Sequence, residues 1–184
     1  MKKTEPKRKV VIEKIADHLL VHGLKGSSLR KMAATAETSD RMLLYYFADK
    51  RELMTAALTQ VTARLVNLLE SARSEKMTFQ IFLPHLAKMM KDPRVRPYLR
   101  LSLELVALAA EEKESYGAIV RKIWYDFLGW IASALQVDRE EDRIPLAALA
   151  LATTEGFMLL DALDCGSIIT DALEGITIRS SASS

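Results

Sequence analysis

The chain has 184 residues, of which 49% are hydrophobic and 27% charged. This composition predicts a soluble protein of one medium domain, or of a small module joined to a larger one. The formal net charge of +2 is unevenly distributed, because residues 1–53 carry twelve Lys and Arg against seven Asp and Glu, so that this part is at +5 and the remainder at −3. A basic module on a slightly acidic body indicates that only one end of the chain meets a polyanion.

Two segments could be mistaken for targeting signals. The basic N-terminus is followed at once by charged residues at positions 13, 14 and 17, so we expect no signal peptide. The most apolar stretch, residues 144–163, contains Glu155 and Asp161, which favours a buried helix over a membrane span. Cys165 is the only cysteine, so no internal disulfide can form, and a cytoplasmic location is predicted.

The N-terminal third has the pattern of a helix-turn-helix module. Apolar residues between positions 12 and 20 recur at the spacing of one helix face, and this helix stops at Gly23. Ser27 or Ser28 can cap a second helix of about two turns, and Ser39 can cap a third. A break of only about three residues between the second and third helices matches the helix-turn-helix arrangement.

The third helix carries two adjacent tyrosines. Leu43 and Phe47 form its inward pair, so Tyr45 and Tyr46 lie roughly 100° to 200° around the helix from Leu43 and face outward or sideways. Spacing alone leaves two alternatives for them. They either cover the seam with the next helix or contact something outside the protein, such as a phosphate group.

Everything after Leu53 predicts helix, which makes the expected fold class all-α. Asp49 can cap a long fourth helix that ends near Ser74. Later helices are expected over residues 78–91 with a kink at Pro84, from about 97 to 111, and over 114–135, 144–163 and 168–178. Only the segment ITIR, residues 176–179, is ambiguous between helix and strand.

Residues 36–53, AETSDRMLLYYFADKREL, follow the second expected helix. They resemble the TetR family of bacterial one-component transcription regulators, in which Ala-Gly-Val-Ser-Lys-Gly-Thr-Leu-Tyr-Tyr-His-Phe, a short link and Lys-Glu-Glu-Leu are usual. The resemblance covers residues 8–55, and the remainder is similar only in being helical and of the right length. It implies a DNA-binding domain over residues 1–53, with its motif at about 28–47, and a helical effector-binding and dimerisation domain over residues 54–184.

Among the departures from the family motif, three bear most on the turn and on DNA contacts. Glu37 stands where glycine is usual, so either Glu37 bears a cost on the order of 1 kcal/mol for a left-handed backbone or the turn differs. Asp40 stands where lysine is usual; its carboxylate suits the helix dipole, repels phosphate and can accept from a cytosine amino group. Arg41 stands where glycine is usual and is an added candidate for reading guanine.

The resemblance implies three groups of DNA contacts. The residues expected on phosphates are Ser28, Ser39, Tyr45, Tyr46 and Lys50. The residues expected at base edges, in the first turn of the third helix, are Asp40, Arg41 and Met42. An N-terminal arm, Lys7, Arg8 and Lys9, can add phosphate or minor-groove contacts. The alternatives are a solvated charge for Lys50 and contact with the second helix for Met42.

Enzymes and metal sites have little support in the sequence. His18 and His22 have the spacing of a zinc-binding pair, but no third ligand cluster accompanies them, so we predict no metal and no other cofactor. A ferritin-like di-iron protein needs Glu-x-x-His pairs on two helices, and the chain has none. Neither a glycine-rich phosphate loop nor a Ser/His/Asp arrangement is present, so no catalytic residue is predicted.

The second domain is where a small-molecule effector would bind. Its bulky residues at helical spacing are either core residues or the lining of a partly apolar pocket, in which Glu104, Tyr116, Tyr125 or Glu155 provides the polar group. The expected lining is Tyr98, Leu101, Glu104, Leu105, Tyr116, Trp124, Phe127, Glu155, Phe157 and Met158. A carboxylate in this role favours a cationic or hydroxylated apolar effector.

The helix from Ile144 is apolar nearly all round and rich in small residues, which let helices approach closely. In the TetR family the last two long helices of each subunit form a four-helix dimer interface. The resemblance therefore implies a homodimer whose interface contains Ala148, Ala152, Gly156 and Leu160. Reading a palindromic operator requires such a dimer.

The sequence thus predicts a cytoplasmic, homodimeric repressor that binds a palindromic operator in double-stranded DNA, does not associate with a membrane, and is released by an unidentified small-molecule effector. Nothing in the residues excludes activation in place of repression. The alternative is a helical ligand-binding or enzymatic bundle with a vestigial DNA module, which Glu37 and Asp40 make conceivable. Cys165 is expected to be a buried inert thiol rather than a redox sensor.

Overall fold

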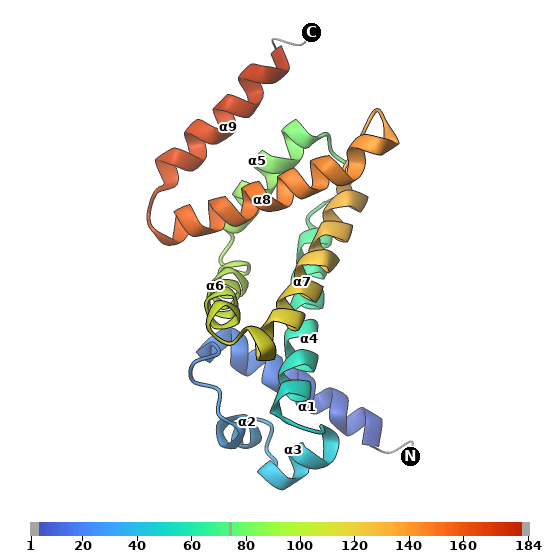
Figure 1. Ribbon diagram of the computed structural model, residues 1–184, viewed down its shortest axis with the longest axis vertical. Helices are drawn as coiled ribbons and strands as arrows, with labels where there is room; N and C mark the ends of the chain where they lie inside the picture. Colours follow the sequence, from blue (N-terminus) through green and yellow to red (C-terminus); the bar gives the residue numbers. More distant parts are fainter. Residues whose placement is uncertain (1–3, 74, 182–184) are drawn as a thin grey trace. The chain divides into compact units, whose positions relative to one another are not determined.

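The computed structural model describes the backbone of residues 4–73 and 75–181, which is helical apart from its connections (Figure 1). The helices are α1 (Thr4–His22), α2 (Leu29–Thr35), α3 (Asp40–Tyr46), α4 (Lys50–Ser71), α5 (Phe79–Met90), α6 (Arg96–Glu111), α7 (Lys113–Ala134), the short 3-10 helix η1 (Glu140–Asp142), α8 (Arg143–Ala162) and α9 (Gly166–Ser181). Within these residues no strand forms, and an isolated β-bridge pairs Met77 with Leu135. The all-α prediction is confirmed, and the ambiguous ITIR segment belongs to α9.

Three helices have boundaries that differ clearly from the predicted ones. α9 spans Gly166–Ser181 instead of residues 168–178. α4 ends at Ser71 instead of near residue 74. α1 begins at Thr4, well before the first periodic apolar residue, so the basic segment expected as an arm is part of this helix. Lysine and arginine are good helix formers, and the side chain of Arg8 is bound to residues of α3 and α4, which extends the helix toward the N-terminus.

The chain folds into two compact units, each built from two separate segments of the chain. The first unit comprises Met1–Asn67 and Pro97–Ile123, and the second comprises Leu68–Arg96 and Trp124–Ser184. α4 and α7 therefore each contribute residues to both units. The predicted division into a DNA-binding domain and an effector-binding domain at residue 53 is a division by function, and it stays a prediction.

The first unit has a core between α1, α2, α3 and α4. Its fully or almost fully buried side chains include Ile15, Leu19, Met32, Leu43 and Phe47. These are the positions that helical spacing predicts as inward. Because Leu43 and Phe47 both point into this core, the opposite side of α3 faces solvent.

Side-chain caps determine where the short helices begin. Ser28 and Ser39 each accept a hydrogen bond from the backbone N–H three residues ahead, at 3.3 and 3.2 Å, as predicted. Asp49 caps α4 by accepting from the N–H of Glu52 at 2.7 Å, and the Glu52 carboxylate accepts in return from the N–H of Ala48 at 2.6 Å. These bonds satisfy N–H groups that a first helical turn leaves without partners.

The turn between α2 and α3 keeps the left-handed geometry that normally calls for glycine. Glu37 has φ of 54°, and the N–H of Thr38 donates to the carbonyl of Ala33 at 2.9 Å, closing the end of α2. Lys14 lies 2.7 Å from the Glu37 carboxylate, and its hydrogen bond and charge lower the pKa of that group. Of the two alternatives for Glu37, the structure has the strained residue and not a different turn.

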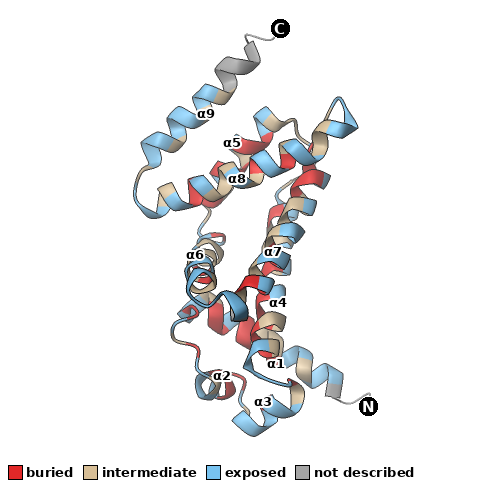
Figure 2. Cartoon of the chain, in the orientation of Figure 1, coloured by how far each residue is buried: buried red, intermediate tan, exposed pale blue. Residues whose placement is uncertain are grey.

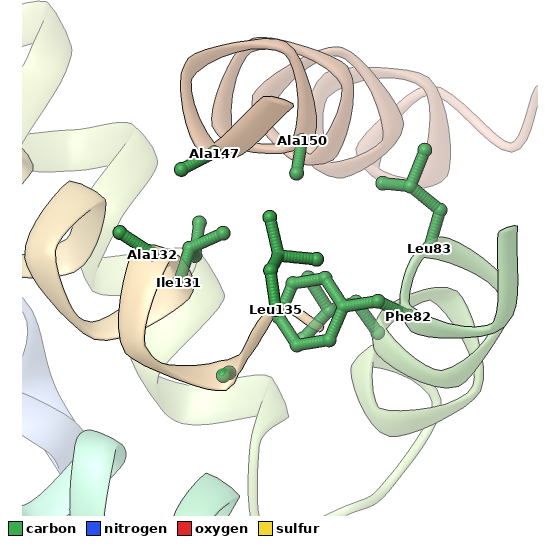
Figure 3. Close-up of a cluster of buried hydrophobic side chains, with 9 residues drawn as sticks. Phe82, Leu83, Ile131, Ala132, Leu135, Ala147 and Ala150 are labelled. Atoms are coloured by element: carbon green, nitrogen blue, oxygen red, sulfur yellow. The ribbon is translucent and has the colours of Figure 1, made fainter. Parts of the chain in front are cut away.

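The second unit has its core where α5, α7 and α8 meet (Figure 3). The side chains that fill it are Phe82 and Leu83 of α5, Ile131, Ala132 and Leu135 near the end of α7, and Ala147 and Ala150 of α8. Alanine at the two α8 positions lets this helix lie close to its neighbours. Arg143, at the start of α8, donates to the carbonyls of Ala132 and Leu135 at 2.9 and 2.8 Å and so satisfies the end of α7.

α8 also bears on the question of a membrane span. Among the described residues, the segment 140–162 is the one helix long and apolar enough to cross a bilayer, by length and composition alone. Ala147 and Ala150 are fully buried in the core of the second unit, and the half-buried Glu155 lies further along the same helix. One side of α8 therefore belongs to the core of this unit.

Glu37 provides a test of the strained turn. Glu37→Gly should raise the free energy of unfolding by about 1 kcal/mol, because glycine adopts a positive φ without the clash that an L side chain makes. Chemical denaturation of both proteins measures this difference. Glu37→Ala is the matched control, since it removes the contact with Lys14 but keeps the strain, and it should not stabilise. Equal stability of the Gly and Ala variants would contradict the assignment of strain.

Candidate nucleic-acid interface

α3 presents a continuous outer side of large and charged residues. Tyr45 is 68% exposed, Leu44 50% and Met42 37%, whereas Leu43 is fully buried. Asp40 and Arg41, in the first turn, are exposed as well. Figure 2 shows the exposed residues of α3. Met42 is therefore partly exposed, and the outer side of α3 is accessible to a ligand.

The two tyrosines have different environments. Tyr45 projects into solvent, while Tyr46 is half-buried and meets the Tyr45 ring edge-on at 5.6 Å between centroids. Of the two alternatives from spacing, an outward position holds for Tyr45. Tyr46 is partly covered, and its backbone carbonyl accepts from the Arg8 guanidinium at 3.3 Å.

Most other predicted DNA contacts are also accessible. Ser28, Ser39, Lys50, Lys7 and Lys9 are exposed. The hydroxyl groups of both serines already accept from backbone N–H groups, so each would meet a phosphate as a donor. The basic side chains at positions 7 and 9 project from the first part of α1, not from an extended arm.

Arg8 has a position that the sequence did not predict. Its guanidinium donates to the Glu52 carboxylate at 2.8 Å and lies 4.7 Å from the centre of the Phe47 ring. It thereby joins α1 to the end of α3 and the start of α4. A contact of Arg8 with DNA stays a prediction. In this structure its guanidinium forms an ion pair with Glu52.

A second set of charged contacts joins α4 to α1. Arg64 of α4 donates to the carboxylates of Glu13 and of Asp17, the latter at 2.6 Å, and Gln60 donates to Glu13 at 2.7 Å. These contacts lie one to three turns along α1 from Arg8. α1 is therefore joined to α4 through Arg64 and Gln60 as well as through Arg8.

α6 holds the C-terminal end of α1. Arg100 donates to the carbonyls of Leu20 and Val21 at 2.7 and 3.0 Å, and Glu104 accepts from the N–H of Leu24 at 2.7 Å. The Glu104 carboxylate also lies against Gly23, where a Cβ atom would come within 2.5 Å of both its oxygens. Gly23 has φ of +73°, so both its backbone and this contact call for glycine. Sequence reasoning identified Gly23 as a helix stop but did not identify its partner.

Solved structures with a similar fold cover nearly the whole chain. A TetR-family transcriptional regulator from Rhodococcus sp. matches with a TM-score of 0.70 at 21% identity, over 94% of this chain and 97% of that one. A transcriptional regulator from Rhodococcus sp. Rha1 gives 0.67 at 21% identity over 92% of each chain, and Salmonella enterica GusR gives 0.65 at 14% over 94% of each. The chain has the TetR-family fold. No model of a protein family matches the sequence, and no curated protein matches it.

Within this TetR-family fold, the residues expected to line an effector pocket are divided between the two units. Tyr98, Leu101, Glu104, Leu105 and Tyr116 belong to the first unit, and Trp124, Phe127, Glu155, Phe157 and Met158 belong to the second. Leu101, Leu105, Phe157 and Met158 are buried, and the other six are half-buried. Their joint role as a pocket stays a prediction. For Glu104, the structure shows a backbone N–H as its partner.

Two grooves lie within single units and contain none of these residues. One, of about 500 Å³, lies between the starts of α4 and α7 and is lined by residues that include Arg51, Thr55, Glu114 and Ile119. The other, of about 230 Å³, lies between α5 and α9, with Ala87, Met90, Ile169 and Leu173 among its lining residues. Neither groove was predicted from the sequence.

Glu155 has the most perturbed environment among the predicted pocket residues. It is half-buried on α8, and burial raises the pKa of its carboxyl group to about 7. A carboxyl group in such surroundings changes its charge near neutral pH. Glu155 can therefore either donate a hydrogen bond to a ligand or attract a cationic one.

The hydrogen bond between Glu104 and the N–H of Leu24 can be tested by substitution. Glu104→Ala should lower the free energy of unfolding by about 1–2 kcal/mol, because it leaves the N–H of Leu24 without its acceptor. Glu104→Gln keeps an acceptor oxygen and should fall between this variant and the parent. Glu111→Ala, an exposed position at the end of the same helix, is the control for loss of a charge. Identical denaturation midpoints for the two alanine variants would show that the contact contributes nothing.

Glu155 provides a test that depends on pH. Its folded pKa of about 7 lies above the ordinary value of 4.5, so the folded state binds the proton more tightly than the unfolded chain. The resulting stability is complete below about pH 4.5 and is lost as the pH rises through 7. Glu155→Gln removes this loss, so it should raise the free energy of unfolding by roughly 2 kcal/mol at pH 8 and by much less at pH 5.

Denaturation of parent and variant at both pH values measures the effect of Glu155. Glu174→Gln, at an exposed position of α9, should change stability equally at the two pH values. A gain for Glu155→Gln that does not vary with pH would contradict the raised pKa.

Proposed function

We propose that the chain is a DNA-binding transcriptional regulator of the TetR type, most simply a repressor that an effector releases from a palindromic operator. The observation that carries this proposal is α3, in which Leu43 is buried while Arg41, Met42 and Tyr45 face solvent, and which is followed directly by the buried Phe47. A short helix fixed by its inner side, with charged and aromatic residues on its outer side, is how a recognition helix enters the major groove. The similarity of fold to TetR-family regulators supports the same function.

The roles proposed for the exposed residues follow from their chemistry. Arg41, in the first turn of α3, can donate two hydrogen bonds to the O6 and N7 atoms of guanine. The phenolic hydroxyl of Tyr45 and the ammonium group of Lys50 suit phosphate oxygens, which fix the position of the protein without selecting sequence. Asp40, beside Arg41, would select against a phosphate in its place and favour a cytosine amino group.

Homodimerisation through α8 and α9 is part of the proposal. Ala148, Ala152 and Gly156 lie at successive four-residue steps of α8 and are all exposed, and Leu160 is half-buried. On the same helix and just beyond it, Leu149, Leu159 and Leu163 are 52%, 53% and 63% exposed. Figure 2 shows the exposed residues of α8 and α9. Exposed apolar side chains gathered on one helix are what a partner helix pair would cover.

Release by an effector requires a connection between the effector site and the helix-turn-helix. α6 supplies residues of the predicted pocket, Tyr98 and Leu101 among them, and also holds the end of α1 through Arg100 and Glu104. A displacement of α6 would therefore act on the helix that precedes the motif. A tenfold change in DNA affinity needs only about 1.4 kcal/mol of coupling between the two sites.

The function is tested by selecting genomic DNA fragments that the purified protein binds. A regulator should enrich fragments that share a palindrome, with half-sites separated by whole turns of the duplex. Enrichment of no palindrome would favour the alternative, a helical ligand-binding protein with a vestigial DNA module.

Three substitutions separate phosphate contacts from base contacts. Tyr45→Phe should weaken binding to operator and random DNA alike by roughly 0.5–1.5 kcal/mol, because one hydroxyl donor is lost. Lys50→Ala should also weaken both and reduce the slope of log K against log salt by about one. Arg41→Ala should cost roughly 1–3 kcal/mol on the operator and less on random DNA.

Binding titrations with both DNAs at several salt concentrations measure these three effects. If Tyr45→Phe left both affinities unchanged, the tyrosine would have no phosphate contact. If Arg41→Ala weakened both DNAs equally, Arg41 would bind the backbone and not a base.

Gly156 provides the test of the dimer. Gly156→Trp places an indole on the exposed side of α8, where no atom lies within 4 Å of the added Cβ, and should split the dimer by steric conflict with the partner helix. Light scattering measures the mass in solution. Gly129→Trp is the matched control, because Gly129 of α7 is also exposed and open at its Cβ. A dimer that survives Gly156→Trp would exclude this face.

A further inference from the structure

Arg8 is turned into the protein, unlike its basic neighbours. Within the run 7–9, both lysines are exposed and Arg8 is half-buried. Its Nε donates to the carbonyl of Tyr46 at 3.3 Å, one terminal nitrogen donates to Glu52 at 2.8 Å, and its guanidinium carbon lies 4.7 Å from the centre of the Phe47 ring. The three contacts together use the planar, forked shape of a guanidinium, which a lysine ammonium does not have.

Two of these contacts fall at the end of α3. Tyr46 is the last residue of this helix, and its carbonyl is one of those that a helix end leaves without an intrahelical partner. A positive charge at this end is also favoured by the helix dipole. Phe47 leaves the helix with an extended backbone, at φ of −134° and ψ of 136°, and its side chain is buried. Arg8 therefore caps the C-terminal end of α3 from another helix.

The third contact extends to the link between α3 and α4. One oxygen of Glu52 accepts from Arg8, and the other accepts from the N–H of Ala48 at 2.6 Å. The same carboxylate thus fixes both the guanidinium and the link. The side chains of Arg8 and Glu52 are 28% and 43% exposed, so water screens their attraction and the pair stabilises the fold little. What it does provide is a defined geometry.

We propose that Arg8 is a positioning residue, which sets the place of α3 against α1 and so aims Arg41 and Tyr45 at DNA without contacting DNA itself. This inference rests on the proposed function. α3 has only seven residues, which span about 10 Å, so a shift at Tyr46 also moves the first turn. Contacts with base edges carry the sequence preference, whereas phosphate contacts do not. A displaced α3 should therefore lose its preference for the operator before it loses general affinity.

The quantity to measure is the ratio of the affinities for operator and for random DNA, at several salt concentrations. Arg8→Lys keeps the positive charge, so a phosphate contact by Arg8 predicts that the parent's ratio and salt slope survive. The positioning role predicts that this ratio falls roughly tenfold in Arg8→Lys, as in Arg8→Ala, because lysine cannot make the three contacts. Arg121→Ala, at an exposed position of α7, is the control for loss of a charge and should keep the ratio.

Glu52→Gln separates geometry from charge by the sign of its effect. The variant keeps an oxygen for the N–H of Ala48 but loses the ion pair with Arg8. Removal of a negative charge alone should strengthen binding to every DNA. The positioning role predicts the opposite on the operator, with the ratio falling about as far as in Arg8→Ala. Glu111→Gln, at an exposed position of α6, is the matched control and should keep the ratio.

Two further readouts test whether the contacts act as a unit. The double variant of Arg8→Ala and Glu52→Gln should lose no more of the ratio than Arg8→Ala alone, because both changes break the same set of contacts. NMR of the free protein should show the Nε–H resonance of Arg8 shifted by the Phe47 ring and slow to exchange with water. Glu52→Gln should move this resonance toward that of an exposed arginine.

Three results would each overturn the proposal. They are a parent-like ratio in Arg8→Lys, tighter binding of both DNAs by Glu52→Gln, and an Arg8 resonance that Glu52→Gln does not change. Operator binding by the parent tests the proposed function, whereas the comparison among variants and the NMR of the free protein test the role of Arg8. Failure of one can therefore be told from failure of the other.

Discussion

The first unit depends on one constraint, which is that α2 and α3 are too short to be stable alone. Each has seven residues, and an isolated helix in water needs about 12–15 to be even marginally populated. Their stability must come from the caps at Ser28 and Ser39 and from burial of Met32, Leu43 and Phe47. The long helices α1 and α4 supply the surface against which those side chains are buried. Burial of the inner side of α3 therefore determines which of its residues remain exposed to solvent.

The sequence predicted the local features well, because they depend on neighbours along the chain. Helical spacing identified Leu43 and Phe47 as inward, and side-chain chemistry identified Ser39 and Asp49 as caps. At Glu37 the sequence left two alternatives, a left-handed residue or a different turn, and the structure has the left-handed residue. Each of these inferences needs only the geometry of one helix or one turn. The exposure of Tyr45 follows from the same spacing.

Contacts between residues far apart in the chain could not be predicted in the same way. Arg8 belongs to a basic segment typical of a DNA-binding arm, but its guanidinium donates a hydrogen bond to Glu52, 44 residues later. Glu104 lies among apolar residues in the sequence and was predicted as the polar group of a pocket. Its carboxylate instead accepts a hydrogen bond from a backbone N–H 80 residues earlier. A carboxylate or guanidinium has many possible partners, and only the fold decides among them. The effector pocket predicted around Glu155 depends on such long-range placement, so the sequence alone does not determine it.

α6 is attached to the end of α1 by a hydrogen-bond donor, Arg100, and an acceptor, Glu104, which bind neighbouring backbone groups. Arg100 binds carbonyls before Gly23 and Glu104 binds an N–H after it, so the helix end and the following loop are attached to the same turn of α6. A displacement of α6 along α1 would therefore break hydrogen bonds to carbonyls and to an N–H group together. The end of α1 and the loop that follows it are thus coupled to α6 as one segment, so that a change at either place is transmitted to the other.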